Sequence, residues 1–180
     1  MNNYCFSIII PVQESSRRVR FSHIGISLAE SETIYGILNG TFHVLEEDQE
    51  IFFNDTSVAG SIKFSFPYPF SDPFFDLFSE GWYQIKHVLK DMKRRRNKDL
   101  EVQFYFDGLL RDEEVVHFGL IFQLKNLNQH EFEMAIEKIE YQVDTITMEL
   151  FKKREGGPTS TYTYNVPKRR WIRQNEPHET

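Results

Sequence analysis

The stretch "FDGLLRDEEVVHFGLIFQLK", residues 106–125, has the greatest potential for chemistry in this chain. Carboxylates cluster near a predicted turn, and an amide and an amine follow on the next predicted strand: Asp107, Asp112, Glu113, Glu114, Gln123 and Lys125. Carboxylates beside a lysine could hold a divalent cation against a phosphodiester and position a water for attack. Such hydrolysis requires Asp107, Asp112 and Lys125 to meet in one cleft.

The order of these groups resembles the carboxylate-then-(D/E)xK arrangement of restriction-type nucleases. Gln123 stands where that pattern has its middle acid, and the similarity covers fewer than twenty residues. The resemblance implies a metal-dependent nuclease, which we keep as an alternative. A charged hairpin turn with a lysine on an edge strand explains the same residues without a metal, and we prefer that interpretation.

Other sequence patterns that accompany catalysis or cofactor binding are not found. The six histidines are scattered without the paired spacing of zinc sites, and Cys5 is the single cysteine, in an apolar segment. The nine glycines form neither a GxxxxGK nor a GxGxxG phosphate-binding loop. We therefore expect no catalytic residue, no metal site and no cofactor, and we favour a protein that is not an enzyme.

The formal net charge of -6 hides blocks of opposite charge. Residues 86–98 contain seven basic side chains and one acidic side chain, and residues 152–173 have the same composition. Between them, residues 99–151 contain twelve acidic and three basic side chains. Any binding that depends on charge should therefore depend on which blocks meet in space.

The two basic blocks have two interpretations. Cations at the end of a helix complement the negative end of its dipole, and both blocks follow a predicted helix, so we favour this explanation. In the alternative, the blocks converge into a nucleic-acid site in which an indole ring stacks on unpaired bases. That site would use Lys93, Arg94, Arg95, Arg96, Lys168, Arg169, Arg170 and Trp171.

An acidic stripe follows one side of the second predicted helix, opposite its apolar side. Its members are Glu133, Glu137, Glu140 and Asp144. A solvated helix face explains the stripe most simply, although like charges at this spacing cost a few tenths of a kcal/mol per pair. The stripe could also bind a basic protein partner and speed its association. Partner binding requires these four side chains to be accessible.

Short apolar or alternating runs predict strands through much of the chain. The candidate strands are residues 4–12, 19–28, 41–47, 50–55, 57–70, 100–108 and 114–125. The last two are expected to form an antiparallel hairpin across "GLLRDE".

Apolar residues at three- and four-residue spacing predict an amphipathic helix over about residues 72–95. Ser71 is a suitable N-cap, and Pro73 suits the first turn because its missing N–H is not needed there. A shorter helix is expected from Ser31 to Gly40.

A second amphipathic helix is predicted over residues 129–153, where Asn128 and Glu131 form a capping box. Several β-branched residues weaken the latter half of this helix. They leave an alternative in which residues 141–153 form a strand that pairs with residues 159–166. The spacing of the apolar residues favours the helix.

These elements predict a single α+β domain over residues 1–166, with a mostly antiparallel sheet packed against the two amphipathic helices. Residues 167–180, first basic and then polar, are expected to form a C-terminal tail. One cysteine and no long apolar stretch predict a cytoplasmic protein without a membrane segment.

We therefore predict a non-enzymatic protein-binding module, of the kind represented by immunity or inhibitor proteins, which binds a protein partner through charged surface blocks. Nucleic-acid association through the basic blocks, a homodimer and the metal-dependent nuclease are the alternatives.

Overall fold

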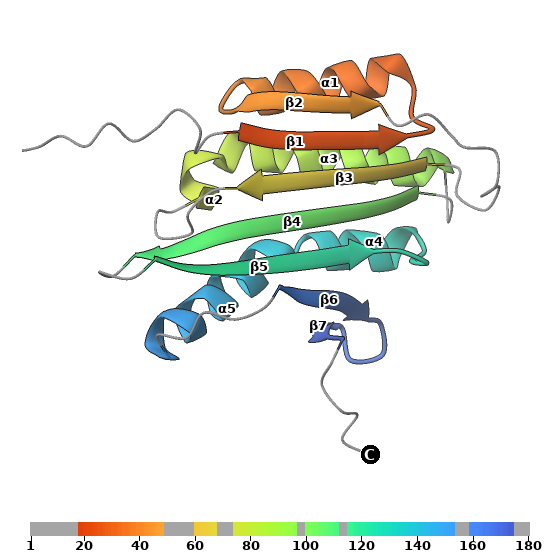
Figure 1. The fold of residues 1–180 in the computed structure, drawn as a ribbon. Helices are drawn as coiled ribbons and strands as arrows, with labels where there is room; N and C mark the ends of the chain where they lie inside the picture. The colour runs from red at the N-terminus through yellow and green to blue at the C-terminus, as the bar shows by residue number, and fades with distance from the viewer. Residues whose placement is uncertain are drawn as a thin grey trace, which may run out of the picture.

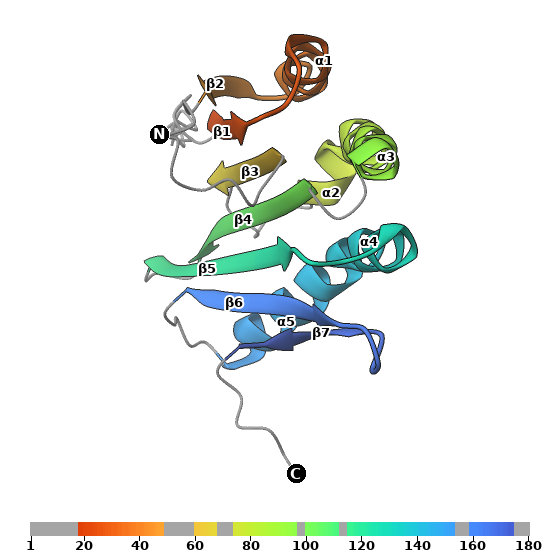
Figure 2. The ribbon, with the colours of Figure 1, turned by 90° about the vertical axis from the view of Figure 1, so that its right-hand side faces the viewer.

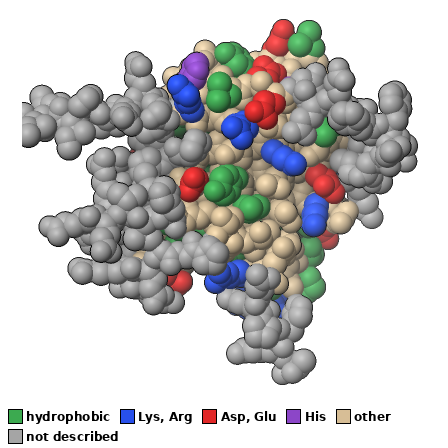
Figure 3. Space-filling model, in the orientation of Figure 1, with side chains coloured by type: hydrophobic (Ala, Val, Ile, Leu, Met, Phe, Trp, Pro, Cys, Tyr) green, Lys and Arg blue, Asp and Glu red, His purple; other side chains and the backbone are tan. Residues whose placement is uncertain are grey.

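The structure, a computed structural model, describes residues 18–48, 60–67, 74–96, 100–111, 115–153 and 159–174. One sheet forms one layer, and the described helices all pack on the same side of it (Figure 1 and Figure 2). The opposite side of the sheet faces the viewer in Figure 3. The predicted α+β class is confirmed. The candidate strands at residues 4–12 and 50–55 lie outside the described residues, as do Ser71 and Pro73.

Seven strands form the sheet in the order β2-β1-β3-β4-β5-β6-β7. Their bounds are β1 Arg18–Ile24, β2 His43–Asp48, β3 Gly60–Pro67, β4 Leu100–Arg111, β5 Val115–Leu124, β6 Ser160–Asn165 and β7 Arg170–Arg173. The pairs β1/β2, β3/β4 and β5/β6 are parallel, whereas β1/β3, β4/β5 and β6/β7 are antiparallel. The predicted hairpin is β4/β5.

The sheet is therefore mixed, and the prediction of a mostly antiparallel sheet was wrong in this respect. Parallel neighbours need a long crossover, and each parallel pair is joined by one or two helices. The helices are α1 Leu28–Asn39, α2 Phe74–Leu77, α3 Ser79–Arg96, α4 Gln129–Ile136 and α5 Ile139–Lys153. Because these connections leave from alternating ends of the sheet, parallel and antiparallel pairs alternate.

The helix predictions hold with three changes of boundary. The first amphipathic helix is divided at Phe78 into α2 and α3, and the second is divided into α4 and α5, so residues 141–153 are helical. Asn128 and Glu131 form the predicted capping box of α4. The short helix begins earlier than predicted, because Ser27 caps α1 in a capping box with Glu30, and Ser31 is buried inside the helix.

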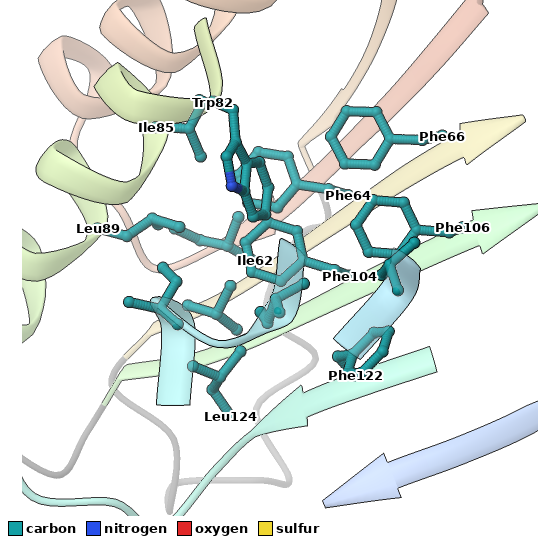
Figure 4. Packing of buried hydrophobic residues seen from close by; sticks show 14 of the residues in the cluster. Ile62, Phe64, Phe66, Trp82, Ile85, Leu89, Phe104, Phe106, Phe122 and Leu124 are labelled. Carbon is teal, nitrogen blue, oxygen red and sulfur yellow. The ribbon is translucent and has the colours of Figure 1, made fainter. Parts of the chain in front are cut away.

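Aromatic rings fill the space between the sheet and the helices. The ring of Phe64 stacks on those of Phe21 and Phe104, with centroids 5.6 and 5.0 Å away, so the rings continue from β1 to β4. Trp82 of α3 meets Phe104 edge-to-face at 5.2 Å, and Figure 4 shows Trp82 and Leu89 pointing toward the sheet. This packing fixes the position of α3 across the middle of the sheet.

The described part of the predicted tail belongs to the sheet. Residues 167–169 lie in the turn between β6 and β7, and Trp171 of β7 is only 5% exposed. Its indole N–H donates to the Ala135 carbonyl at 3.2 Å, and its ring meets Phe122 at 5.1 Å. A four-residue strand has too little alternation to be predicted from sequence. Residues 175–180 lie outside the described residues.

Gly81 of α3 lies against the ring of Phe78, which leaves no room for a side chain. A Cβ at this position would lie 2.1 Å from Phe78 Cε2, and Phe78 is 1% exposed. Replacing a helical glycine by alanine usually stabilises a protein by about 0.5–1 kcal/mol. Here we expect Gly81→Ala to lower the free energy of unfolding by about 1–3 kcal/mol, because overpacking outweighs helix propensity.

Gly36 of α1 provides the matched control, because a Cβ there would meet nothing within 4 Å. Gly36→Ala should raise the free energy of unfolding by about 0.5–1 kcal/mol. Urea unfolding of both variants measures the difference. Equal stabilisation of the two variants would show that Phe78 does not restrict position 81.

Candidate functional site

The acidic stripe of the sequence lies beside α3, on the outer layer of the molecule. Glu133 belongs to α4, Glu137 caps its C-terminus, and Glu140 and Asp144 lie in the first half of α5. Glu137 and Asp144 are exposed, and Glu133 and Glu140 are half-buried. The stripe divides into two parts that differ in the contacts of their side chains within the protein.

The first part, Glu133 and Glu137, is occupied by internal contacts. Lys86 Nζ donates to Glu137 Oε2 at 2.9 Å, and Lys90 Nζ donates to Glu137 Oε1. Burial raises the pKa of Glu137, but the two ammonium groups outweigh it, so its pKa lies below the usual value. Glu133 accepts a hydrogen bond from Gln129, whose amide also reaches the Lys90 carbonyl. These contacts fasten α4 to α3.

The second part, Glu140 and Asp144, is only partly neutralised within the protein. Burial raises the pKa of Asp144, and the nearby carboxylates of Glu140 and Asp76 raise it further. Glu140 lies 3.9 Å from Lys86, and no described lysine or arginine forms an ion pair with Asp144 or Asp76. The carboxylates of Glu140 and Asp76 therefore repel that of Asp144 here.

Large apolar side chains lie beside these carboxylates. Tyr141 and Met148 are 73% and 62% exposed, and they lie three residues before and four residues after Asp144 on the same side of α5. Leu77, which is 44% exposed, follows Asp76 in α2. We call Asp76, Leu77, Glu140, Tyr141, Asp144 and Met148 the acidic–apolar surface.

The described part of the first basic block ends α3, as the helix-end interpretation predicts, and its side chains are bound by other groups of the protein. Lys93 is fully buried, with its Nζ 3.4 Å from the Leu100 carbonyl and 5.6 Å from the centroid of Phe132. Arg95 and Arg96 donate to the two carboxylate oxygens of Glu30 at 2.9 and 2.6 Å. Arg94 is exposed and binds Asp91 one turn earlier.

The second basic block lies elsewhere. Lys168 and Arg169 occupy the turn before β7, Arg170 begins β7, and Trp171 is buried. Arg96 of the first block donates to the carbonyl of Gly25, which directly follows β1. Strands β3, β4 and β5 lie between β1 and β6 in the sheet. Four strand spacings of about 4.8 Å place β1 and β6 about 19 Å apart. The described members of the two blocks therefore do not form one continuous patch.

The residues of the nuclease alternative are also separated. Asp107 pairs with Gly119, whereas Lys125 follows Leu124, which pairs with Val102 near the other end of β4. Six residues of strand correspond to about 20 Å, so Asp107 and Lys125 do not meet. Asp112 lies outside the described residues. Within the described ranges, no group of three or more His, Cys, Asp or Glu side chains could hold a metal ion.

Sequence reasoning missed Asp76, Leu77, Tyr141 and Met148. Asp76 is far from α5 in the sequence, and its proximity to Asp144 depends on how α2 packs. The exposure of Tyr141 and Met148 could have been inferred, because neither falls on the predicted apolar side of the helix.

Glu30 should give the protein a pH-dependent stability. Burial raises its pKa, but hydrogen bonds from the Ser27 N–H and hydroxyl and from Arg96 lower it to about 2. Because the folded pKa is below the usual 4.5, the stabilisation is present above about pH 4.5 and is lost as the pH falls toward 2. We expect Glu30→Gln to lower the free energy of unfolding at neutral pH by about 1–2 kcal/mol.

Urea unfolding of wild type and Glu30→Gln at several pH values measures this effect. The difference in stability should shrink steadily between pH 5 and pH 2. A difference that is constant across this range would show that the charge on Glu30 does not stabilise the fold.

The two parts of the acidic stripe should respond oppositely when a charge is removed. Asp144 has a raised pKa, so its charged form is less favourable in the folded state than in the unfolded state, and Asp144→Asn should raise Tm at pH 7. Glu137 has a lowered pKa, so Glu137→Gln should lower Tm. Differential scanning calorimetry measures both, and the gain from Asp144→Asn should disappear at low pH, where Asp144 is protonated in both states. A lower Tm for both variants would contradict this division.

The described helices include none with the length and apolar composition needed to cross a membrane. Comparisons with protein-family models, with curated proteins and with solved structures find nothing that matches this chain.

Proposed function

We propose that the chain is a non-enzymatic protein-binding module that takes a basic protein partner on the acidic–apolar surface. The observation that supports this most is the group of Asp76, Glu140 and Asp144, in which only Glu140 has a described ion-pair partner, beside exposed Leu77, Tyr141 and Met148. Carboxylates around exposed apolar side chains suit a partner that presents lysine or arginine around an apolar centre.

The proposal is consistent with the energetics of the free protein. Burial and the carboxylates of Glu140 and Asp76 disfavour the charged form of Asp144, and lysine or arginine from a partner would offset this repulsion on binding. The same charges would raise the rate of encounter with a basic partner. The class that we propose is an immunity- or inhibitor-type protein that covers a basic partner, and the cytoplasm remains the expected compartment because Cys5 is the single cysteine.

Nucleic-acid binding through the two basic blocks has less support. Lys93 and Trp171 are buried, and Arg95 and Arg96 are bound to Glu30. A homodimer remains an alternative for the acidic–apolar surface, although a second copy would bring like charges together.

Affinity capture with charge-reversal variants tests the proposal. Wild type, Asp144→Lys and Glu32→Lys are immobilised separately and exposed to an extract of the producing cells, and retained proteins are measured by quantitative mass spectrometry. Glu32 is an exposed residue of α1, so its variant has the same change in net charge at another place. We expect a basic protein to be retained by wild type and Glu32→Lys and reduced at least about tenfold by Asp144→Lys, because like charges then face each other.

The retained protein is then purified, and its affinity is measured by isothermal titration calorimetry at two salt concentrations. Tyr141→Ser should also weaken the complex, because it removes an exposed ring without changing the charge. Equal retention by wild type and both charge variants, or an acidic retained protein, would exclude the proposed surface.

A further inference from the structure

The side of the sheet opposite the helices, here called the open face, carries an ordered set of polar side chains. Strand register places Ser22, Lys63, Gln103, Gln123 and Thr163 in one row from β1 to β6, on the side away from the aromatic core. Figure 3 shows charged side chains scattered around a largely uncharged centre of this face. This row offers ammonium, amide and hydroxyl groups, except that Ser22 is buried and donates its hydroxyl to Glu47, which continues the row onto β2.

A tyrosine lies over the sheet in the next row. Tyr105 of β4 pairs with Ile121 of β5, and a Cβ on Gly119 would lie 2.8 Å from Tyr105 Cε2. The ring therefore leans over β5, where glycine leaves space for it, and the Thr159 side chain hydrogen-bonds to the phenol. A half-buried ring held in this way provides a stacking surface that needs little ordering when a ligand binds.

Two lysines flank a small hollow in the open face. The hollow has a volume of about 110 Å³ and is lined by Ser61, Lys63, Gln103, Gln123 and Lys125, together with Glu101. Neither Lys63 nor Lys125 forms an ion pair with another described residue, and both are exposed. Lys63 is on β3 and Lys125 follows β5, so their backbones are about 12 Å apart.

The charges of the molecule are distributed differently on its two sides. By alternation along the strands, the described part of the open face carries five basic and three acidic side chains: Arg18, Arg20, Lys63, Lys125 and Arg170 against Glu47, Glu101 and Asp107. The acidic stripe lies on the helical side. A polyanion would therefore approach the open face more readily than the helices.

We propose that the open face binds single-stranded nucleic acid. Lys63 and Lys125 contact phosphates, the amides of Gln103 and Gln123 hydrogen-bond to base edges, and Tyr105 stacks on a base. The exposed side of a sheet fits unpaired bases better than a duplex, because bases in a duplex are already stacked on one another. This surface is separate from the basic blocks and from the acidic–apolar surface.

Fluorescence anisotropy with labelled single-stranded oligonucleotides of about 12 nucleotides tests this proposal, at about 50 mM and about 200 mM salt. The test variant is Lys63→Glu/Lys125→Glu. The control is Arg94→Glu/Lys168→Glu, which makes the same charge change at two exposed residues of the basic blocks. We expect the test variant to bind at least about tenfold more weakly than wild type, and the control to bind within about twofold.

Two further measurements separate specific contacts from general attraction. Loss of two phosphate contacts should reduce the slope of log affinity against log salt by about 1.4. Gln103→Ala/Gln123→Ala should weaken binding without changing that slope. Thermal unfolding of each variant checks its fold. If the Tm of the test variant is lower than that of wild type, Lys63→Gln/Lys125→Gln takes its place.

Three outcomes would overturn the proposal. They are no binding by wild type at the lower salt concentration, equal losses in the test and control variants, and tighter binding of a duplex of the same length. Loss in the control alone would also overturn it and would assign binding to the basic blocks instead.

Discussion

Helix α3 joins the helical layer together, because its cations reach carboxylates on the helices at both of its sides. Lys86 and Lys90 bind Glu137 at the end of α4, and Arg95 and Arg96 bind Glu30 in the first turn of α1. The aromatic contacts of Trp82 hold the same helix on the sheet. The described part of the basic run at residues 86–98 is therefore chiefly structural. Most of its charges form ion pairs with carboxylates of the same chain.

This arrangement explains why the acidic stripe has two parts. Glu137 lies where α3 presents lysines, and it is neutralised. Asp144 lies two turns further along, where α2 presents Asp76 instead of a cation, and it is not neutralised. A helix face chosen only for solubility could have lysines between its acids, which would avoid the repulsion. The retained repulsion is the physical basis of the proposed binding surface.

The sequence predicted the features that depend on local spacing. The capping box at Asn128, the hairpin of β4 and β5 and the helix over residues 141–153 follow from short-range periodicity and capping chemistry. The mixed sheet was not predicted, although the helix between β3 and β4 was. A helix between two strands allows them to be parallel neighbours, but it does not decide which strands lie side by side. Trp171 was placed in a tail because one aromatic residue among charges gives no periodic signal.

Features that depend on tertiary contacts could not be predicted in the same way. Glu137 and Lys86 are fifty-one residues apart in the sequence, and only packing decides that they meet while Asp144 meets Asp76. The net charge of -6 is equally uninformative about ligands, because many charges pair within the helical layer. The two proposed binding surfaces use described charges that have no ion pair, which are negative at Asp76 and Asp144 and positive at Lys63 and Lys125. One acidic chain can therefore present surfaces of opposite sign, and its partners are better inferred from each surface than from the total charge.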